Sequence, residues 1–185
     1  MQKTDSFDGI LTFTGTPFRP WDPDPDNIFL TDIAHALSLQ NRWNGHTRLP
    51  VCVAEHSLNV LKYVTHRDES KAIRIQALLH DATEAYLPDL TSPVKHRMSQ
   101  FQEMEAKVWD AICIRFGIET EMRGIVEEAD REVFYYEYHT SMNRSDDIEI
   151  PVPKQPFTSV HSPATRTPHQ WKHEFMKECS RLGIE

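Results

Sequence analysis

The feature of the sequence that most limits its fold is a helical spacing of apolar residues, which recurs from about residue 30 almost to the C-terminus. Leu, Ile, Val, Phe and Ala return every three or four positions, so each helix would have one apolar face to bury. Glycine and proline separate these stretches, and no stretch alternates convincingly between apolar and polar residues as a half-buried strand would. The pattern predicts an all-α domain, a single compact bundle of five to six or more helices.

Several helix ends can be placed from single residues. Thr31 or Asp32 is a candidate N-cap for the first helix, and Gly117 is a candidate stop signal. Thr167 followed by Pro168 has the pattern of a cap and a first helical position. We therefore expect helices over residues 33–40, from 53 onward, over 69–85, 100–116 and 119–140, and from 167 onward.

The chain of 185 residues fits one domain better than two. The proline-rich N-terminal stretch predicts an extended lead-in or a short strand pair, and a long polar stretch near the C-terminus predicts a loop that could serve as a lid or a subunit contact. The predicted parts are a lead-in (1–29), a helical core (30–140) with loops at 41–52 and 86–99, a loop (141–166) and a C-terminal helix (167–185).

Charge and cysteine content exclude some classes of partner. A formal charge of −8 argues against binding to nucleic acid or to a membrane surface through a broad cationic field. No apolar run approaches the roughly 20 residues needed to cross a bilayer, and the first residues lack the pattern of a secretory signal. Cys52, Cys113 and Cys179 are isolated and odd in number, which predicts buried or free thiols in a reducing compartment. We expect a soluble cytoplasmic protein.

Two imidazoles and two carboxylates form the candidate metal site. His56 and Asp130 lie within apolar helical stripes, and His80 and Asp81 are adjacent on a third helix. Buried imidazoles and carboxylates are costly unless they are paired or bind a metal. This donor set suits a first-row divalent cation with positions left for water, and it accepts Zn, Co, Mn, Fe or Mg.

A structural role is the alternative for each of these residues taken singly. His56 could be held by a backbone carbonyl, and Asp130 could pair with Arg131 or a lysine. Four such residues on three matching helices favour the metal site over separate structural roles.

Three segments carry a resemblance to a known family. AEHSLNV, LLHDATEAYLPDLTSPVK and EEADREV are similar to the H…HD…D pattern of HD-domain phosphohydrolases. The resemblance is narrower to the small branch with bacterial 5′-deoxynucleotidases and phage dATP triphosphohydrolases. NRW at 41–43 resembles the phosphate-site segment of that branch. The resemblance covers about residues 30 to 137.

The resemblance implies a role for each matching residue. His56, His80, Asp81 and Asp130 would be the metal ligands, and Glu84 the general acid or base beside the reacting phosphate. Arg42 would contact the phosphate, Trp43 would lie against the sugar, and Asp89 would hold the 3′-hydroxyl, which would favour deoxyribose.

The residues themselves support Glu84 independently. It follows His80 by four positions, which is one turn along the same face of the predicted helix. Alternatives remain for the others: Trp43 could be core, Arg42 a surface charge and Asp89 a turn residue.

A single metal and hydrolysis fit better than a dinuclear oxygenase, which would need more histidines between the HD pair and the last Asp. Only His96 lies there, in a predicted loop. Further divalent ions could arrive with a polyphosphate. Hydrolysis would cleave the P–O5′ bond of a deoxynucleotide.

The number of phosphates in the substrate depends on nearby cations. Arg48, Lys95 and Arg97, with His96, flank the predicted site, which favours a deoxynucleoside triphosphate and release of triphosphate. A 5′-deoxynucleotidase acting on monophosphates is the alternative, and a non-catalytic nucleotide sensor is the alternative of another class.

The GHTRLP loop and the proline-rich lead-in look most like the phage proteins, which implies a preference for dATP and a host cytoplasm as the location. Trp21 and Ile28 are candidates to line the base pocket, although both could be packing residues. Trp171, Phe175 and the run Phe134-Tyr-Tyr are more apolar than a small monomer needs to expose, so we expect a homo-oligomer.

Overall fold

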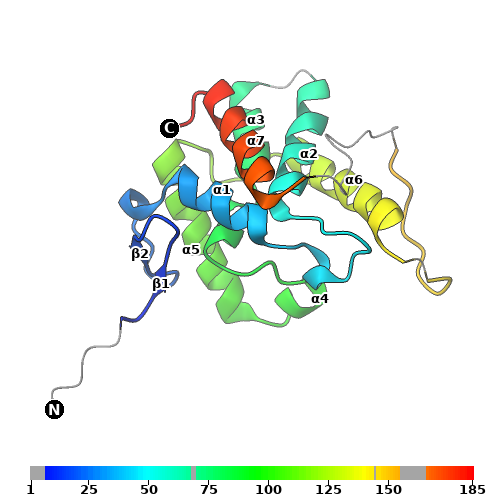
Figure 1. Ribbon diagram of the computed structural model, residues 1–185, viewed down its shortest axis with the longest axis horizontal. Coiled ribbons are helices and arrows are strands. Elements are labelled where there is room, and N and C mark those ends of the chain that lie inside the picture. Colours follow the sequence, from blue (N-terminus) through cyan, green and yellow to red (C-terminus); the bar gives the residue numbers. More distant parts are fainter. Residues whose placement is uncertain (1–6, 68–69, 144, 155–165) are drawn as a thin grey trace, which may run out of the picture.

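The computed structural model describes residues 7–67, 70–143, 145–154 and 166–185, and confirms the all-α architecture (Figure 1). The described helices are α1 (Leu30–Leu39), α2 (Val53–His66), α3 (Lys71–Leu79), α4 (Ser92–Lys95), α5 (Ser99–Phe116), α6 (Gly124–Ser141) and α7 (Pro168–Arg181). Short 3₁₀ turns are η1 (Pro25–Asn27), η2 (Trp43–Gly45) and η3 (Ala82–Ala85). Strands β1 (Ile10–Leu11) and β2 (Pro17–Phe18) form an antiparallel hairpin. No helix in these ranges is both long and apolar enough to cross a membrane.

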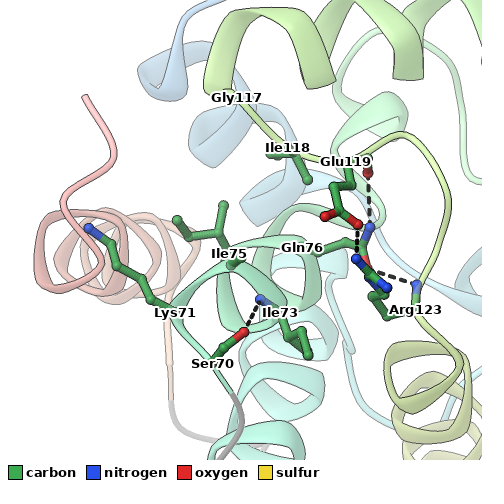
Figure 2. A pocket seen from close by; sticks show the side chains of 10 residues that line it. Ser70, Lys71, Ile73, Ile75, Gln76, Gly117, Ile118, Glu119 and Arg123 are labelled. Atoms are coloured by element: carbon green, nitrogen blue, oxygen red, sulfur yellow. Dashed lines mark hydrogen bonds and ion pairs between the residues drawn. The ribbon is translucent and has the colours of Figure 1, made fainter.

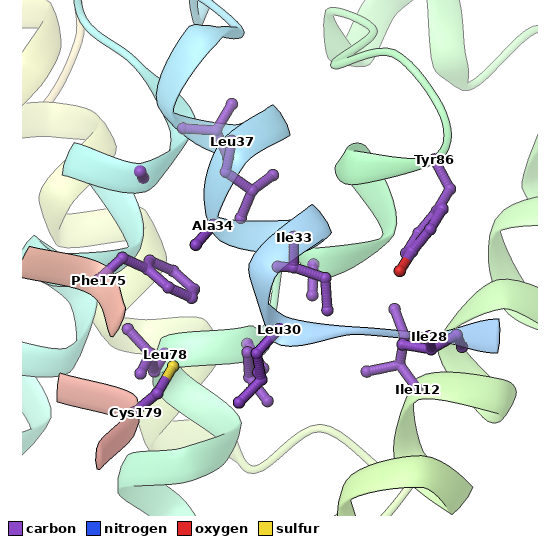
Figure 3. Close-up of a cluster of buried hydrophobic side chains, with 14 of the residues drawn as sticks. Ile28, Leu30, Ile33, Ala34, Leu37, Leu78, Tyr86, Ile112, Phe175 and Cys179 are labelled. Carbon is purple, nitrogen blue, oxygen red and sulfur yellow. The ribbon is translucent and has the colours of Figure 1, made fainter. Parts of the chain in front are cut away.

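The core lies where α1 meets α7, α2 and η3 (Figure 3). Ile33, Leu78, Ile112 and Phe175 are completely buried there, and they come from α1, α3, α5 and α7. The C-terminal helix therefore returns to the first helix and closes the bundle. Its apolar face is the last layer of this core.

The apolar residues that favoured a homo-oligomer pack largely within the chain. Trp171 is 4% exposed and Phe175 is 0% exposed, because α7 buries both against α1 and α2 of the same chain. Phe134 is half-buried against Trp43, with ring centroids 4.7 Å apart. Trp171, Phe175 and Phe134 are thus packed within the chain, and self-association stays a prediction.

The lead-in is the strand pair that was one of its two predicted forms. Ile10 pairs with Phe18, and the turn between the strands is held to α1 by Asp32. The Asp32 carboxylate accepts hydrogen bonds from the Thr14 amide (2.7 Å) and the Thr14 hydroxyl (2.9 Å). The prediction that Thr31 or Asp32 caps α1 was wrong: Phe29 occupies the cap position, and Asp32 is buried inside the first turn.

Two other predicted helix ends are correct and one is not. Gly117 closes α5 in the left-handed conformation, with φ of 63°. Thr167 forms a reciprocal capping box with Gln170 at the start of α7. However, α6 begins at Gly124 and not at residue 119. The Gln76 side chain holds residues 119–123 as a loop, donating to the carbonyls of residues 119 and 121 and accepting from the amide of residue 123.

The predicted loop over 141–166 lies partly outside the described residues. In the part that is described, the Lys154 amide donates to Glu132 of α6 at 2.7 Å. The His139 ring nitrogen lies 3.2 Å from the carbonyl of Ile150. This stretch is fastened to a helix of its own chain.

Candidate metal centre

Donor atoms from three separate segments meet at one point. One ligand atom from each of His56, His80 and Asp130 lies within 4.8 Å of the others. His56 Nε2 is 3.0 Å from Asp130 Oδ1 and 3.6 Å from Asp81 Oδ2, and His80 Nε2 is 3.2 Å from the same Asp81 oxygen. Donors around a tetrahedral metal with bonds near 2.1 Å lie roughly 3.4 Å apart. His56, His80 and Asp130 could therefore hold a divalent cation, and Asp81 lies beside them through its Oδ2.

The unpaired atoms of the site point to the same conclusion. His56 Nε2 and His80 Nε2 are both buried and have no well-formed hydrogen bond within the described chain. Their Nδ1 atoms are engaged, at 2.8 Å from Glu137 Oε1 and 2.9 Å from the Ala77 carbonyl. Buried polar atoms normally have partners, and these two nitrogens face aspartate oxygens in an arrangement that could hold a metal ion.

The end of α3 allows two adjacent residues, His80 and Asp81, to reach this site. The helix predicted over 69–85 is in fact α3, which ends at Leu79, followed by the separate turn η3. In a continuous helix, neighbouring side chains point about 100° apart. Because the helix ends here and Asp81 has φ −99° and ψ 15°, His80 and Asp81 both reach the same point. Glu84 consequently lies on η3 and not one turn along the helix of His80.

The exposure of the ligands varies from the interior to the surface. The His56 side chain is 0% exposed, His80 6%, Asp81 21% and Asp130 47%. Asp130 was expected to turn toward the core, and it lies half-exposed beside the buried imidazoles. The site is therefore open to solvent on the side of Asp130.

The charges around the site favour a cation. Burial would raise the pKa of Asp81, but His80, His56 and Arg42 hold that pKa well below its usual value. Burial and Arg42 act to lower the pKa of His56. Glu137 and Asp130 act more strongly in the opposite direction, so that the pKa is raised to about 10. In the metal-free protein a proton on His56 is stabilised by the same carboxylates that would stabilise a metal ion.

Arg42 is held at this site by the fold of its loop. Its amide donates to the Val51 carbonyl at 2.8 Å, and the Val53 amide donates to the Gln40 carbonyl at 3.0 Å, so both ends of the loop close at the start of α2. The Arg42 side chain is 12% exposed and donates from Nη1 to Asp81 at 3.3 Å. The predicted phosphate contact is thus beside the metal ligands.

Glu137 is the residue that the sequence reasoning missed. It is 2% exposed and accepts from Arg42 Nε at 3.0 Å, while its other oxygen meets His56 Nδ1. It follows Asp130 by seven residues, which is two turns along the same face of α6. That spacing was the available signal. A buried glutamate in the stripe of Ala129 and Val133 could have been weighed with the ligands.

Glu84 and Asp89 both lie in the electrostatic field of the site. Burial raises the pKa of Glu84 well above its usual value, and Asp81 and Asp89 raise it further. Glu84 Oε2 is buried without a hydrogen bond in the described chain. Burial also raises the pKa of Asp89, while Arg42 acts to lower it. Glu84 has the environment of a carboxyl group that can hold a proton.

Trp43 adopts a backbone conformation that is rare for a bulky residue. Its φ is 58° and that of Asn44 is 50°, and such left-handed positions cost roughly 1–3 kcal/mol each. The indole stacks on Phe134, and its Nε1 is buried without a partner in the described chain. Trp43 follows Arg42 in the sequence. Its position is consistent with packing in the core and also with contact to a ligand.

The three predicted phosphate-tail cations are engaged with the protein. Arg48 donates to the carbonyl of Thr140 at 2.6 Å, and Arg97 donates to the carbonyl of Pro93 at 2.6 Å. Lys95 pairs with Glu105 at 2.5 Å. Burial lowers the pKa of Lys95, but Glu105, Glu84 and Asp81 together raise it. The pKa of Lys95 is therefore affected by two carboxylates of the candidate site, Glu84 and Asp81.

Of the two candidates for a base pocket, one is core. Ile28 is 0% exposed and belongs to the main apolar cluster, which is the packing role that had been its alternative. Trp21 is 39% exposed, and its carbonyl accepts from Lys107 at 3.2 Å. Ile28 cannot reach a ligand without unfolding its surroundings.

A separate cavity of about 660 Å³ lies between the start of α3 and the loop after α5 (Figure 2). Figure 2 shows Gln76 donating to a loop carbonyl and Arg123 paired with Glu119. None of the metal ligands lines it. It is not part of the candidate centre.

Comparison with known proteins identifies relatives without an assigned activity. No protein-family model matches the sequence. An uncharacterized protein of Rhodobacter capsulatus is 38% identical over 102 residues, 52% of each chain. The uncharacterized protein YfdR of Escherichia coli is 33% identical over 121 residues, 65% of each chain. The chain thus spans less than two thirds of the length of these curated relatives, and membership of the HD family stays a prediction.

Proposed function

We propose that this protein is a metal-dependent phosphohydrolase that cleaves the P–O5′ bond of a deoxynucleotide. The observation that carries the proposal is the meeting of two orphaned buried Nε2 atoms with two carboxylates, beside a nearly buried arginine. The structural alternative is an ion-pair network within the chain, because His56 Nε2 lies 3.0 Å from Asp130 and His80 Nε2 lies 3.2 Å from Asp81. The choice of a deoxynucleotide rests on the sequence resemblance alone.

The residues would share the work as follows. His56, His80, Asp81 and Asp130 would hold a divalent cation, which supplies charge to neutralise phosphate oxygens and a water of lowered pKa. Arg42 would bind a non-bridging phosphate oxygen and stabilise negative charge there. Glu84 would hold the proton that the leaving 5′-oxygen needs. Asp89 is close enough to Arg42 and Asp81 for both to affect its pKa, and this position fits a contact with the sugar.

Lys95 is the residue that bears most directly on the proposed number of phosphates. A triphosphate remains the first candidate because Lys95 lies within the field of Asp81 and Glu84, and it could exchange Glu105 for a phosphate. The binding of Arg48 and Arg97 to backbone carbonyls favours the second candidate, a monophosphatase. The loss of Ile28 from the base pocket leaves a preference for dATP without support from that residue.

The test is a substrate panel with matched variants. Protein loaded with Co²⁺ or Mn²⁺ is incubated with deoxynucleoside mono- and triphosphates, and inorganic triphosphate and phosphate are measured separately. Release of triphosphate supports the first candidate, and release of phosphate from monophosphates alone supports the second. Asp81→Ala should lose metal and activity together. If no nucleotide is cleaved by metal-loaded protein, the proposed function is wrong.

Lys95 gives the finer test. Lys95→Ala should raise KM for a triphosphate roughly 10-fold or more, because a hydrogen bond to a charged group contributes about 1.5–3 kcal/mol. Arg97→Ala, two residues away and bonded to a carbonyl, is the matched control and should leave KM unchanged. Equal effects of the two substitutions would contradict the role given to Lys95.

A further inference from the structure

Glu137 joins the two functional halves of the site. It lies on α6 with only 2% of its surface exposed, and each carboxylate oxygen has a different partner. Oε1 is 2.8 Å from Nδ1 of His56, a predicted metal ligand, and Oε2 is 3.0 Å from Nε of Arg42, the predicted phosphate contact. A single side chain is thus bonded to both.

The bond to His56 determines what that imidazole can do. A carboxylate accepts hydrogen bonds, so Nδ1 facing it carries a proton, and in the neutral ring that binds a metal the lone pair is on Nε2. Nε2 is the atom that faces Asp81 and Asp130. A carboxylate behind a ligating histidine fixes the ring and its tautomer and makes the other nitrogen a stronger donor.

The second imidazole is held differently. His80 Nδ1 faces the carbonyl of Ala77, a neutral group of the backbone. His56 is therefore the ligand of the two whose orientation depends on a charged side chain. Changing Glu137 removes that support, whereas the support of His80 is part of α3.

The bond to Arg42 fixes the phosphate side of the site. Arg42 is held at Nε by Glu137 and at Nη1 by Asp81, so its guanidinium plane is set by two carboxylates from different segments. A guanidinium held in this way is positioned before a phosphate arrives, and it loses less freedom on binding.

We propose that Glu137 is a positioning residue that orients His56 for metal binding and Arg42 for phosphate binding at the same time. It touches neither the metal nor the substrate. This inference rests on the metal-binding part of the proposed function, and it holds whether the substrate is a mono- or a triphosphate.

The chain offers a matched control on the same helix. Glu132 is also on α6, is 1% exposed, and accepts a hydrogen bond from the Lys154 amide. This hydrogen bond comes from the loop that contains Lys154, and not from a proposed metal ligand. Glu132→Gln and Glu137→Gln therefore make the same chemical change at the same degree of burial on the same helix.

The experiment measures Co²⁺ affinity by titration of the metal-free full chain, with the visible spectrum as a report of coordination. Glu137→Gln should bind Co²⁺ roughly 10–100-fold more weakly with an altered spectrum, as loss of such a partner does elsewhere. Glu132→Gln should bind as the wild type does. Equal affinity and spectra for Glu137→Gln and the wild type would overturn the inference.

A measurement on the wild type keeps the inference testable if Glu137→Gln does not fold. In Zn²⁺-loaded protein, ¹⁵N chemical shifts of His56 should show a protonated Nδ1 and a metal-bound Nε2. A protonated Nε2, or Nδ1 bound to metal, would overturn it. Loss of metal affinity in Glu137→Gln without nucleotide cleavage by the wild type would reject the proposed function alone. Cleavage by the wild type with unchanged affinity in Glu137→Gln would reject this inference alone.

Discussion

His56 shows how the site is built at the scale of one residue. Its side chain is completely buried, with one ring nitrogen against Glu137 and the other facing two aspartates. Burial of a charged or polar group is costly unless its partners compensate for the lost water. Each of these partners comes from another segment, so the imidazole is placed by the whole fold and not by α2 alone.

Glu84 provides the clearest prediction at this scale. Glu84→Gln removes the proton-holding group but no metal ligand, so Co²⁺ affinity should stay the same. Turnover of whichever nucleotide is cleaved should fall by roughly 10²–10⁴-fold, the usual contribution of general acid–base catalysis. Glu103→Gln, an exposed glutamate on α5, is the control. Turnover at the wild-type rate in Glu84→Gln would remove Glu84 from the mechanism.

The individual site residues were predictable to different degrees. His56, His80, Asp81 and Asp130 could be found because their residue types and helical positions are visible in the sequence. The acceptors of Arg48 and Arg97 could not, since both are backbone carbonyls, and one is 92 residues away. The sequence shows that an arginine side chain is present but not which acceptor it will bind.

At the scale of the elements, the N-terminal hairpin is attached to the bundle by a side chain. Asp32 is 3% exposed and accepts two hydrogen bonds from Thr14, which is 18 residues earlier. The hairpin itself has only two residues in each strand, and a short isolated hairpin is marginal in water. Its position therefore depends on contacts with α1 and on packing by Phe18, which stacks on Tyr86.

Asp32→Ala should loosen this hairpin. Loss of a buried acceptor leaves the Thr14 amide without its partner, so the free energy of unfolding should fall by about 1–3 kcal/mol. Residues 7–18 should also become more sensitive to limited proteolysis in the folded protein. Asp26→Ala, at an exposed aspartate in η1, is the control for loss of a carboxylate. Unchanged stability and cleavage in Asp32→Ala would contradict the attachment.

Helix ends were predictable where the signal is local. Thr167, Pro168 and Gly117 act within four residues of their helix ends, and all three behave as predicted. Asp32 was misassigned because its partner is in a distant turn, and the start of α6 was misplaced because Gln76 of another helix binds the loop before it. Tertiary hydrogen bonds of this kind override local preference.

For the whole molecule, closure of the bundle by α7 explains why apolar side chains near the C-terminus do not remain on the surface. Phe175 and Cys179 pack into the same cluster as Leu78 (Figure 3). The proposed metal ligands come from α2, the end of α3 and α6, and α2 packs on both other helices. A second apolar cluster, with Val60 of α2, Ala77 of α3 and Val133 of α6, packs these three segments together.

The cysteines report on the integrity of this packing. All three are free and buried, as predicted. Burial raises the pKa of Cys52 and of Cys179 to about 12 and that of Cys113 to about 11. The thiolate is the reactive form, and it forms only as the pH rises toward the pKa. At pH 8 the folded protein should react slowly with iodoacetamide at all three thiols, and the denatured protein rapidly.

Mass spectrometry of the alkylated peptides measures this directly. The reaction rate in the folded protein should rise with pH well above 8, since each pKa is raised relative to the unfolded chain. Rapid modification of one cysteine at pH 8 in the folded protein would show that its surroundings are not packed as described here.

The central claim is that three segments of the chain hold one divalent cation through His56, His80, Asp81 and Asp130. Anomalous diffraction from crystals of Co²⁺-loaded protein tests this most directly. We predict one peak about 2.0–2.2 Å from a donor atom of each of the four side chains, with Glu137 behind His56. Crystals grown with excess Co²⁺ that show no peak between these side chains, or a peak bound only elsewhere, would contradict the account.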